Sequence, residues 1–306
     1  MSDAPRAARA VGPDQGPTIR SVASEILDVP TIREHKLSAL AVTRQSVVLA
    51  RVLTSDGVEG VGEASTLGGP LWAEESVETI KAVIDRYLTP ALIGRPLGAV
   101  RAARAAMDAA ARRNAAAKGA IETALWDALG KTLDAPVHAF LGGAVRQEAP
   151  ALWALASGDP AQEVEEALGM IERGRHTDFK IKIGAQAPEA DLARLRAVAR
   201  GIEGRGRLAV VDANQAWDEP TADRCIPALD EIGVRLLEQP LPAANLAGAA
   251  RLAARHALPL LADESVFTPE DAVAVGVARA ADAVSLKIVK HGGLLGVMDV
   301  AAAARA

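Results

Sequence analysis

The chain of 306 residues contains a single cysteine, Cys225, so no disulfide can form within it. Cys225 lies in a helical pattern, TADRCIPALDEIG, and we interpret it as a buried structural thiol rather than a nucleophile. The formal net charge of -5, without a cluster of lysines and arginines, argues against a nucleic-acid partner. The composition is therefore that of a globular protein that acts on something other than nucleic acid.

Long apolar runs are also missing, because charged residues interrupt every apolar stretch before about 18 residues. We therefore expect no membrane-spanning segment. The first 17 residues contain no continuous apolar segment, and we interpret 1–17 as a disordered leader rather than a signal peptide. Nothing in the sequence indicates secretion, so the expected location is the cytoplasm.

The two halves of the chain differ in their secondary-structure pattern. Residues 18–66 contain three stretches rich in Val, Ile and Leu, and Asp56-Gly57 separates the second from the third in the manner of a hairpin turn. Helical patterns follow, punctuated by Pro90 and Pro96. Antiparallel strands followed by helices predict an α+β domain, which we place at 18–145.

From about residue 146 onward, short apolar runs alternate with helical patterns to the end of the chain. Alternating strands and helices of this kind predict a parallel sheet, open or closed. Both faces of such a sheet are covered, which explains why the expected strands are short apolar runs. We predict a (β/α) barrel domain at 146–306.

Each of five successive expected strands ends in a charged residue that a buried strand should not carry. These residues are Lys182, Asp212, Glu238, Asp263 and Lys287, at intervals of 30, 26, 25 and 24 residues. One βα unit takes about that length, since eight units make about 250 residues. The five side chains therefore occupy equivalent positions at the carboxyl ends of the strands, where barrel enzymes build their active sites. A barrel also brings them around a common centre, which an open sheet would not do.

Three of these residues, Asp212, Glu238 and Asp263, are carboxylates that would repel one another in a partly dry site. A divalent cation removes that repulsion. Because the three ligands are all oxygen donors, a hard ion such as Mg²⁺ or Mn²⁺ is expected.

Lysines lie on both sides of the three acids. Lys180 and Lys182 are two residues apart on a strand, so both side chains point the same way, and we expect their mutual repulsion and the metal to lower their pKa. Lys287 is expected across the site from Lys182. A metal ion with lysines on both sides suits a reaction that passes through an enolate. The metal stabilises the enolate, and a lysine transfers a proton at the neighbouring carbon.

Five motifs together resemble the signature of the enolase superfamily, in its muconate-lactonizing subgroup. They are K-I-K at 180–182, D-A-N at 212–214, E-Q-P at 238–240, A-D-E-S at 262–265 and L-K-I-V-K-H-G-G at 286–293. Within the subgroup, residues 31–38, 62–76 and 153–159 resemble those of muconate and chloromuconate cycloisomerases. The resemblance implies an α+β capping domain on an enolase-type (β/α) barrel.

The same resemblance implies a cycloisomerase that converts cis,cis-muconate, or a chloro derivative, to muconolactone through a metal-stabilised enolate. Mn²⁺ is the implied cofactor, with Mg²⁺ possible, and a small dicarboxylate the implied substrate of a homo-oligomeric enzyme. Lys182 would protonate the α carbon, Lys180 would supply positive charge near the enolate, and Lys287 would act electrostatically from the opposite face. The implied substrate-binding residues are Asn214, Leu67 and Trp72.

Other functions stay open. A racemase or epimerase of amino-acid derivatives, or an o-succinylbenzoate synthase, would use the same lysines, with Lys287 as a second base. The chain ends at Ala306, inside the helix after the sixth expected strand, whereas a closed barrel needs two further βα units. We therefore expect a barrel truncated after its sixth strand. A catalytically impaired remnant that only binds metal is the alternative of another class.

Overall fold

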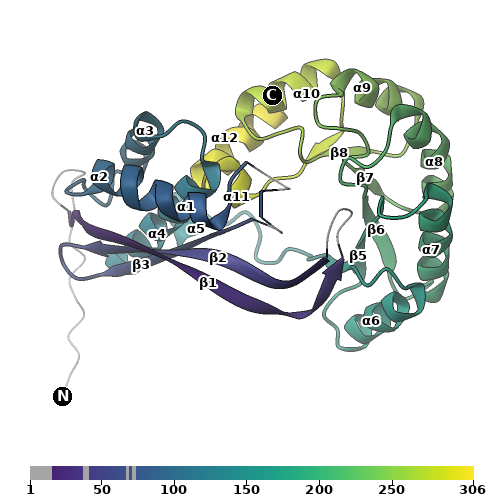
Figure 1. The fold of residues 1–306 in the computed structure, drawn as a ribbon, viewed down its shortest axis with the longest axis horizontal. Helices are drawn as coiled ribbons and strands as arrows, with labels where there is room; N and C mark the ends of the chain where they lie inside the picture. Colours follow the sequence, from purple (N-terminus) through teal and green to yellow (C-terminus); the bar gives the residue numbers. More distant parts are fainter. Residues whose placement is uncertain (1–15, 37–40, 67–68, 71–73) are drawn as a thin grey trace. The chain divides into compact units, whose positions relative to one another are not determined.

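The computed structural model describes residues 16–36, 41–66, 69–70 and 74–306. Leu67, Trp72 and all but the last two residues of the predicted leader lie outside the described residues. Contacts divide the chain into two compact units (Figure 1). The first contains the described residues of 1–29, 44–147 and 287–297, and the second those of 30–43, 148–286 and 298–306. The domain boundaries expected from the sequence, 18–145 and 146–306, stay predictions.

The N-terminal strands form a three-stranded sheet in the order β1-β2-β3, with β1 at Ile19–Lys36, β2 at Ala41–Thr54 and β3 at Glu59–Ser65. β2 and β3 are antiparallel, with Val47 opposite Ser65 and Leu53 opposite Glu59. Gly57 in the connecting turn has a φ of 86°, a conformation that glycine adopts without strain. The hairpin predicted at Asp56-Gly57 is therefore confirmed.

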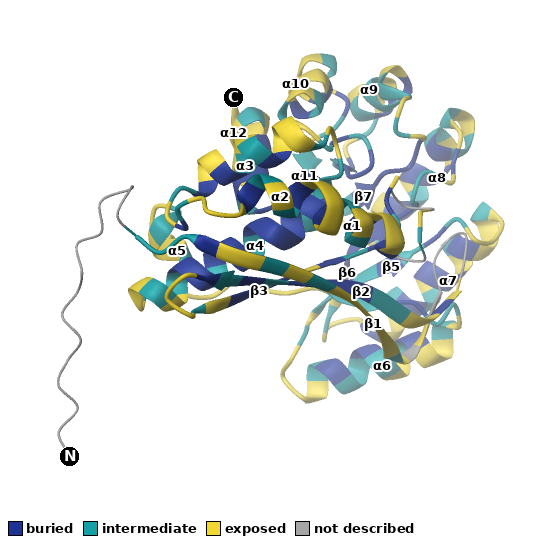
Figure 2. Ribbon diagram, turned by 60° about the vertical axis from the view of Figure 1, so that its left-hand side comes forward, coloured by how far each residue is buried: buried dark blue, intermediate teal, exposed yellow. Residues whose placement is uncertain are grey.

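Helices of the first unit supply most of the residues in its buried core. They are α1 (Val77–Val83), η1 (Ile84–Leu88), α2 (Thr89–Leu92), α3 (Val100–Ala110), α4 (Ala115–Leu133), α5 (Val137–Phe140) and α11 (Ile288–His291). The central helix α4 is buried along most of its length, as its dark colour in Figure 2 shows. Its many alanines and glycines let neighbouring elements approach its backbone closely, so α4 is the centre of this core.

Strand β3 approaches α4 so closely that two of its positions have no room for a side chain. A Cβ atom at Gly62 would lie 2.0 Å from the carbonyl oxygen of Ala120, and one at Gly60 would lie 2.1 Å from that of Ala124. Both contacts are with backbone atoms of a helix, which cannot rotate away. The absence of a side chain at these glycines is therefore required by packing.

We expect Gly62→Ala to lower the free energy of unfolding by about 1–3 kcal/mol, because the methyl group forces β3 away from α4. Gly98→Ala is the matched control, since a Cβ there meets no atom within 4 Å. The control should stay within about 0.5 kcal/mol of the parent chain. Urea unfolding of the two variants measures both free energies. Equal stabilities would show that β3 does not pack so closely on α4 that a side chain at Gly62 is excluded.

The second unit contains a six-stranded parallel sheet in the order β4-β5-β6-β7-β8-β9. The strands are β4 (Trp153–Leu155), β5 (Asp178–Lys182), β6 (Arg207–Asp212), β7 (Leu236–Glu238), β8 (Leu260–Ala262) and β9 (Ala283–Val284). The intervening helices are α6 (Pro160–Glu172), α7 (Pro188–Gly201), α8 (Glu219–Ile232), α9 (Leu246–Arg255) and α10 (Pro269–Ala278). The chain ends in α12 (Leu294–Arg305). The predicted alternation of strands and helices is confirmed.

Figure 1 shows α6, α7, α8 and α9 in an arc along one side of the strands. The residues of β5 explain this arrangement, because Phe179 and Ile181 are fully buried in the core of the second unit, while Lys180 and Lys182 are only partly buried. Lys180 and Lys182 thus share one face of β5, as predicted, while Phe179 and Ile181 lie on the other face. No helix among the described residues is long and apolar enough to cross a membrane.

Candidate active site

The carboxyl ends of four neighbouring strands bring charged side chains together. Lys182 ends β5 and is paired in register with Asp212, which ends β6, and Asp212 is paired with Glu238, which ends β7. Asp263 follows directly on the last residue of β8. The three acids are almost completely buried, each with no more than 2% of its surface exposed. The structure thus places the predicted ligands side by side at one edge of the sheet.

Lys180 lies between two of the acids. Its Nζ is 2.6 Å from Oε2 of Glu238 and 2.9 Å from Oδ2 of Asp212. Burial favours the neutral form of this lysine, but the two carboxylates outweigh burial and raise the pKa of Lys180. This direction is opposite to the one we expected from lysine repulsion and the metal's charge, because the two flanking acids dominate the surroundings of the ammonium group. The effect of a bound metal ion on this pKa stays a prediction.

The carboxyl group of Glu238 is buried among like charges. Burial is the main cause of the raised pKa of Glu238, and the nearby charges of Asp212 and Asp263 raise it further. Among the described residues, no three His, Cys, Asp or Glu side chains form a ready metal site. Three buried carboxylates whose charges oppose one another nevertheless fit a hard divalent ion in donor type and in charge. Asp212, Glu238 and Asp263 are thus chemically suited to hold such an ion.

Lys182 reaches the same group of side chains from β5. Its Nζ donates to Oδ1 of Asn214 at 2.8 Å and lies 3.5 Å from Oδ2 of Asp212. Nδ2 of Asn214 in turn donates to Oε1 of Glu264 at 3.2 Å. The other carboxylate oxygen of Glu264 is buried and has no hydrogen-bond partner among the described residues, and burial raises the pKa of this acid. Asn214 therefore connects Lys182 with the acids of β6 and of the loop after β8.

The loops after β6 and β7 contain backbone conformations that side-chain-bearing residues rarely adopt. Asn214 has a φ of 42° and Gln239 a φ of 38°. Such conformations cost about 1–3 kcal/mol and persist where the surroundings enforce them, often at functional sites. Each residue lies within two positions of a predicted ligand, so the strained backbone marks this edge of the sheet independently of its charges.

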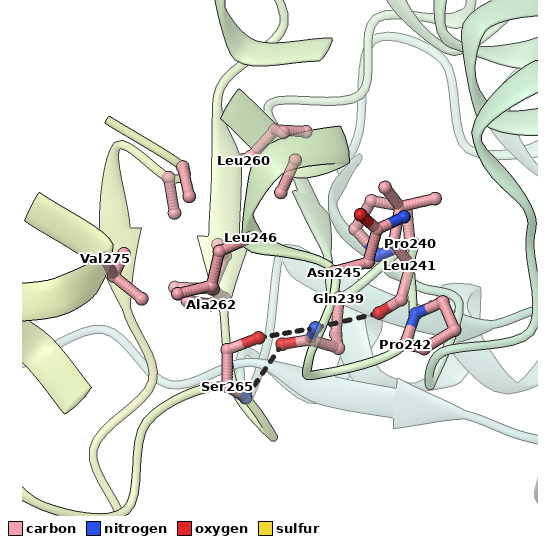
Figure 3. A pocket seen from close by; sticks show the side chains of 14 residues that line it. Gln239, Pro240, Leu241, Pro242, Asn245, Leu246, Leu260, Ala262, Ser265 and Val275 are labelled. Atoms are coloured by element: carbon pink, nitrogen blue, oxygen red, sulfur yellow. Dashed lines mark hydrogen bonds between the residues drawn. The ribbon is translucent and has the colours of Figure 1, made fainter. Parts of the chain in front are cut away.

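Gln239 joins the loops that follow β7 and β8. Its Oε1 accepts from the backbone N–H of Asp263 at 2.9 Å and of Ser265 at 3.2 Å. Its Nε2 donates to Oγ of Ser265 and to the carbonyl oxygen of Leu241, both at 2.9 Å (Figure 3). Because Gln239 directly follows Glu238, these bonds fix Glu238 and Asp263 relative to each other. The sequence placed Gln239 in a motif but gave no sign of this contact, which depends on the positive φ.

A small pocket lies beside these bonds, between β8 and the helices α9 and α10. Apolar side chains such as Leu246, Leu260 and Val275 line it, and Figure 3 shows them around the gap. No lysine or carboxylate is among its lining residues. We therefore regard the pocket as a gap in packing, separate from the charged residues at the strand ends.

We expect Gln239→Leu to destabilise the chain by about 1–3 kcal/mol for each buried N–H that loses its acceptor. The same change should weaken Mn²⁺ binding several-fold, because the backbone of Asp263 is no longer fixed. Gln162→Leu, at an exposed position on α6, is the control. Urea unfolding and a Mn²⁺ titration measure the two effects. Unchanged stability and affinity in Gln239→Leu would show that these bonds hold nothing in place.

The remaining predicted residues are placed differently. Lys287 lies three residues beyond the end of the short strand β9 and occupies the N-cap position of α11 without a side-chain capping bond, rather than ending a strand as expected. The strand ends at Val284, and residues 285–287 lead without regular structure to α11, which begins at Ile288. Lys287 belongs to the first compact unit, and its place opposite Lys182 stays a prediction.

Fold and site together define a class of protein. An N-terminal antiparallel sheet is followed by the six-stranded parallel sheet of an enolase-type barrel domain, with lysines and acids at the carboxyl ends of its strands. Residues 162–306 match the model of an enolase C-terminal domain-like family, and residues 22–142 match the N-terminal domain of mandelate racemase / muconate lactonizing enzyme. The chain belongs to the mandelate racemase and muconate lactonizing enzyme family of the enolase superfamily.

Individual relatives agree with this assignment. A chloromuconate cycloisomerase of Cupriavidus necator is 42% identical over 288 residues, which are 94% of this chain and 77% of the relative. Muconate cycloisomerase 1 of Pseudomonas putida is 45% identical over 280 residues, which are 91% of this chain and 74% of the relative. The chain is thus homologous to muconate cycloisomerases, which are intramolecular lyases.

Solved structures show the same fold. The muconate lactonizing enzyme of Pseudomonas fluorescens complexed with muconolactone has a TM-score of 0.92 and 42% identity, covering 95% of this chain and 78% of that chain. The 2-chloromuconate cycloisomerase of Rhodococcus opacus 1CP has a TM-score of 0.90 and 42% identity, covering 94% of this chain and 78% of that chain. Members of the superfamily bind a divalent metal ion.

Proposed function

We propose that this chain is a cycloisomerase that converts cis,cis-muconate, or a chlorinated derivative, to muconolactone. The observation that carries the proposal is the meeting of Lys180 and Lys182 with the buried carboxylates of Asp212 and Glu238. The muconolactone in the related Pseudomonas fluorescens structure and the names of the relatives support the choice of substrate. As the sequence resemblance implies, we expect a homo-oligomer in the cytoplasm.

Asp212, Glu238 and Asp263 would hold the divalent ion, which we propose to be Mn²⁺, with Mg²⁺ as a substitute. Such an ion supplies a positive charge that binds one carboxylate of the substrate and stabilises negative charge developing on it. The ion would offset the burial of the three acids and the repulsion from Asp212 and Asp263 that helps to raise the pKa of Glu238. Lys180 already contacts two of them, so its ammonium group would stay beside the developing charge.

Lys182 is the proposed proton donor. In the reaction, one carboxylate oxygen of the substrate forms a C–O bond with a carbon of the diene, and the displaced electron pair moves to the carbon next to the other carboxylate. The Lys182 ammonium group gives its proton to that carbon, so the product contains one new C–O bond and one new C–H bond. Asn214 holds Lys182 at 2.8 Å and thereby orients the proton. Lys287, Leu67 and Trp72 stay proposed for electrostatic and substrate-binding roles.

Proton NMR of the reaction in D₂O tests the proposal. We expect the Mn²⁺-loaded chain to form muconolactone that carries one deuterium at the carbon next to its free carboxylate. N-acyl amino acids and dipeptides, offered in parallel, should keep their α proton. Exchange of the α proton in those compounds without any lactone from muconate would overturn the proposal in favour of a racemase or epimerase.

A further inference from the structure

A buried cluster of charges lies on the helix side of strand β5, apart from the residues described so far. Arg194 on α7 donates from Nε to Oε2 of Glu163 at 3.0 Å and from Nη1 to Oδ1 of Asp191 at 3.4 Å. Glu163 and Asp191 are completely buried, and Arg194 is nearly so. All three belong to the second unit. None of them carries a role in the proposed chemistry.

The remaining bonds of this cluster go to the backbone around the catalytic lysine. Nη2 of Arg194 donates to the carbonyl oxygen of Lys182 at 2.8 Å. Oδ2 of Asp191 accepts from the N–H of Gly184, also at 2.8 Å. The peptide groups on both sides of Ile183 are therefore bonded to the same cluster. Oε1 of Glu163 accepts from the N–H of Gly158, which ties the loop after β4 to the same group.

The backbone of Ile183 and Gly184 is also held from the side of β6. The N–H of Ile183 donates to the carbonyl oxygen of Asp212 at 2.8 Å. Gly184 has a φ of 94°, and a Cβ atom there would lie 2.3 Å from Cβ of Ala216. The end of β5 is thus held between the loop after β6 on one side and the Arg194 cluster on the other.

A gain in folding stability does not by itself account for a buried charge cluster of this kind. Burying charged groups is costly, and apolar side chains of similar volume often serve a core equally well or better. The bonds of this cluster are directed at one short segment, the one that carries Lys182. A long lysine side chain can present its proton in a fixed direction only when its backbone is fixed, and a misplacement of about 1 Å can cost about 100-fold in rate.

We infer that Arg194, together with Glu163 and Asp191, is a positioning group that fixes the backbone of Lys182 and so directs its ammonium group toward Asn214 and Asp212. This inference rests on the proposed function in one respect, namely that Lys182 transfers the proton. The cluster acts through Lys182 and touches neither the substrate nor the metal ligands' side chains.

The test compares Arg194→Lys with Val198→Ala. Lysine keeps the positive charge, but a single ammonium group cannot replace the planar guanidinium fork that bonds Glu163, Asp191 and Lys182 together. Val198 is fully buried one turn further along α7, so its truncation loosens the same helix without removing any of these bonds. Two measurements are made on each variant: muconate kinetics with Mn²⁺, and amide hydrogen exchange of the peptide covering 182–184.

We expect kcat of Arg194→Lys to fall by about 10- to 100-fold, while KM and the Mn²⁺ affinity stay within about threefold. Hydrogen exchange at 182–184 should be faster in Arg194→Lys than in Val198→Ala at a matched loss of melting temperature. If Arg194→Lys does not fold, Glu163→Gln takes its place in the same comparison, because it keeps the size of the side chain but removes the charge that holds the guanidinium group of Arg194 in place.

Each of the following outcomes supports or overturns the positioning role of the Arg194 cluster. A kcat that falls no further than in Val198→Ala, with equal exchange at 182–184, would overturn the inference and leave the cluster a stabilising feature only. If the parent chain does not turn over muconate, the proposed function fails by itself. In that case hydrogen exchange still decides the positioning: faster exchange in Arg194→Lys than in Val198→Ala supports it, and equal exchange overturns it.

Discussion

Replacing Lys182 by alanine is expected to lower kcat for muconate by about 10²- to 10⁴-fold, the usual contribution of a positioned acid or base. The ammonium group of Lys182 lies next to Asn214 and Asp212, and no other lysine ends β5. Mn²⁺ affinity should change little, because Lys182 is 3.5 Å from Oδ2 of Asp212 and donates to Asn214 instead. Steady-state kinetics and a Mn²⁺ titration of the same preparation separate the two effects.

Lys131→Ala is the control for this prediction. Lys131 is an exposed residue of α4 that pairs with Asp127, so its loss should leave kcat unchanged. Turnover of more than a few per cent of the parent rate in Lys182→Ala would remove Lys182 from the proton transfer.

The second large effect is expected from the acids. Glu238→Gln should weaken Mn²⁺ binding by on the order of 100-fold or more, since even groups that only support a metal ligand are worth 10- to 100-fold. The buried carboxylate of Glu238 shares its surroundings with Asp212 and Asp263, and its charge is what a divalent ion would neutralise. Isothermal titration with Mn²⁺ gives the affinity directly. A rise of the melting temperature with Mn²⁺ in the parent chain, absent from the variant, would agree with it.

Glu231→Gln serves as the comparison, because Glu231 is an exposed acid near the end of α8. It should bind Mn²⁺ as the parent chain does. An unchanged Mn²⁺ titration in Glu238→Gln would show that Glu238 is not a metal ligand.

The sequence predicted the fold and most of the strand ends because both depend on local pattern. A spacing of about 25 residues between charged strand ends follows from the length of one βα unit, and β5, β6, β7 and β8 end at or directly before the residues chosen in this way. The two-residue spacing of Lys180 and Lys182 was enough to place both lysines on one face. These features need no knowledge of the surroundings.

What the sequence did not predict depends on contacts between distant residues. The raised pKa of Lys180 follows from two acids that lie 32 and 58 positions further along the chain, whose distances the pattern does not contain. Arg194 has the spacing of an ordinary helix residue, and only the fold shows that it reaches the carbonyl oxygen of Lys182. The hydrogen bonds between Gln239 and the loop after β8 depend in the same way on an unusual backbone conformation.

The central claim is that these lysines and acids form the active site of a metal-dependent cycloisomerase. The most direct measurement follows the absorbance of the muconate diene after cis,cis-muconate is added to the Mn²⁺-loaded chain. We predict that the absorbance falls at a rate proportional to protein concentration and that EDTA stops the loss. A Mn²⁺-loaded chain that is folded yet leaves the absorbance unchanged would contradict the claim.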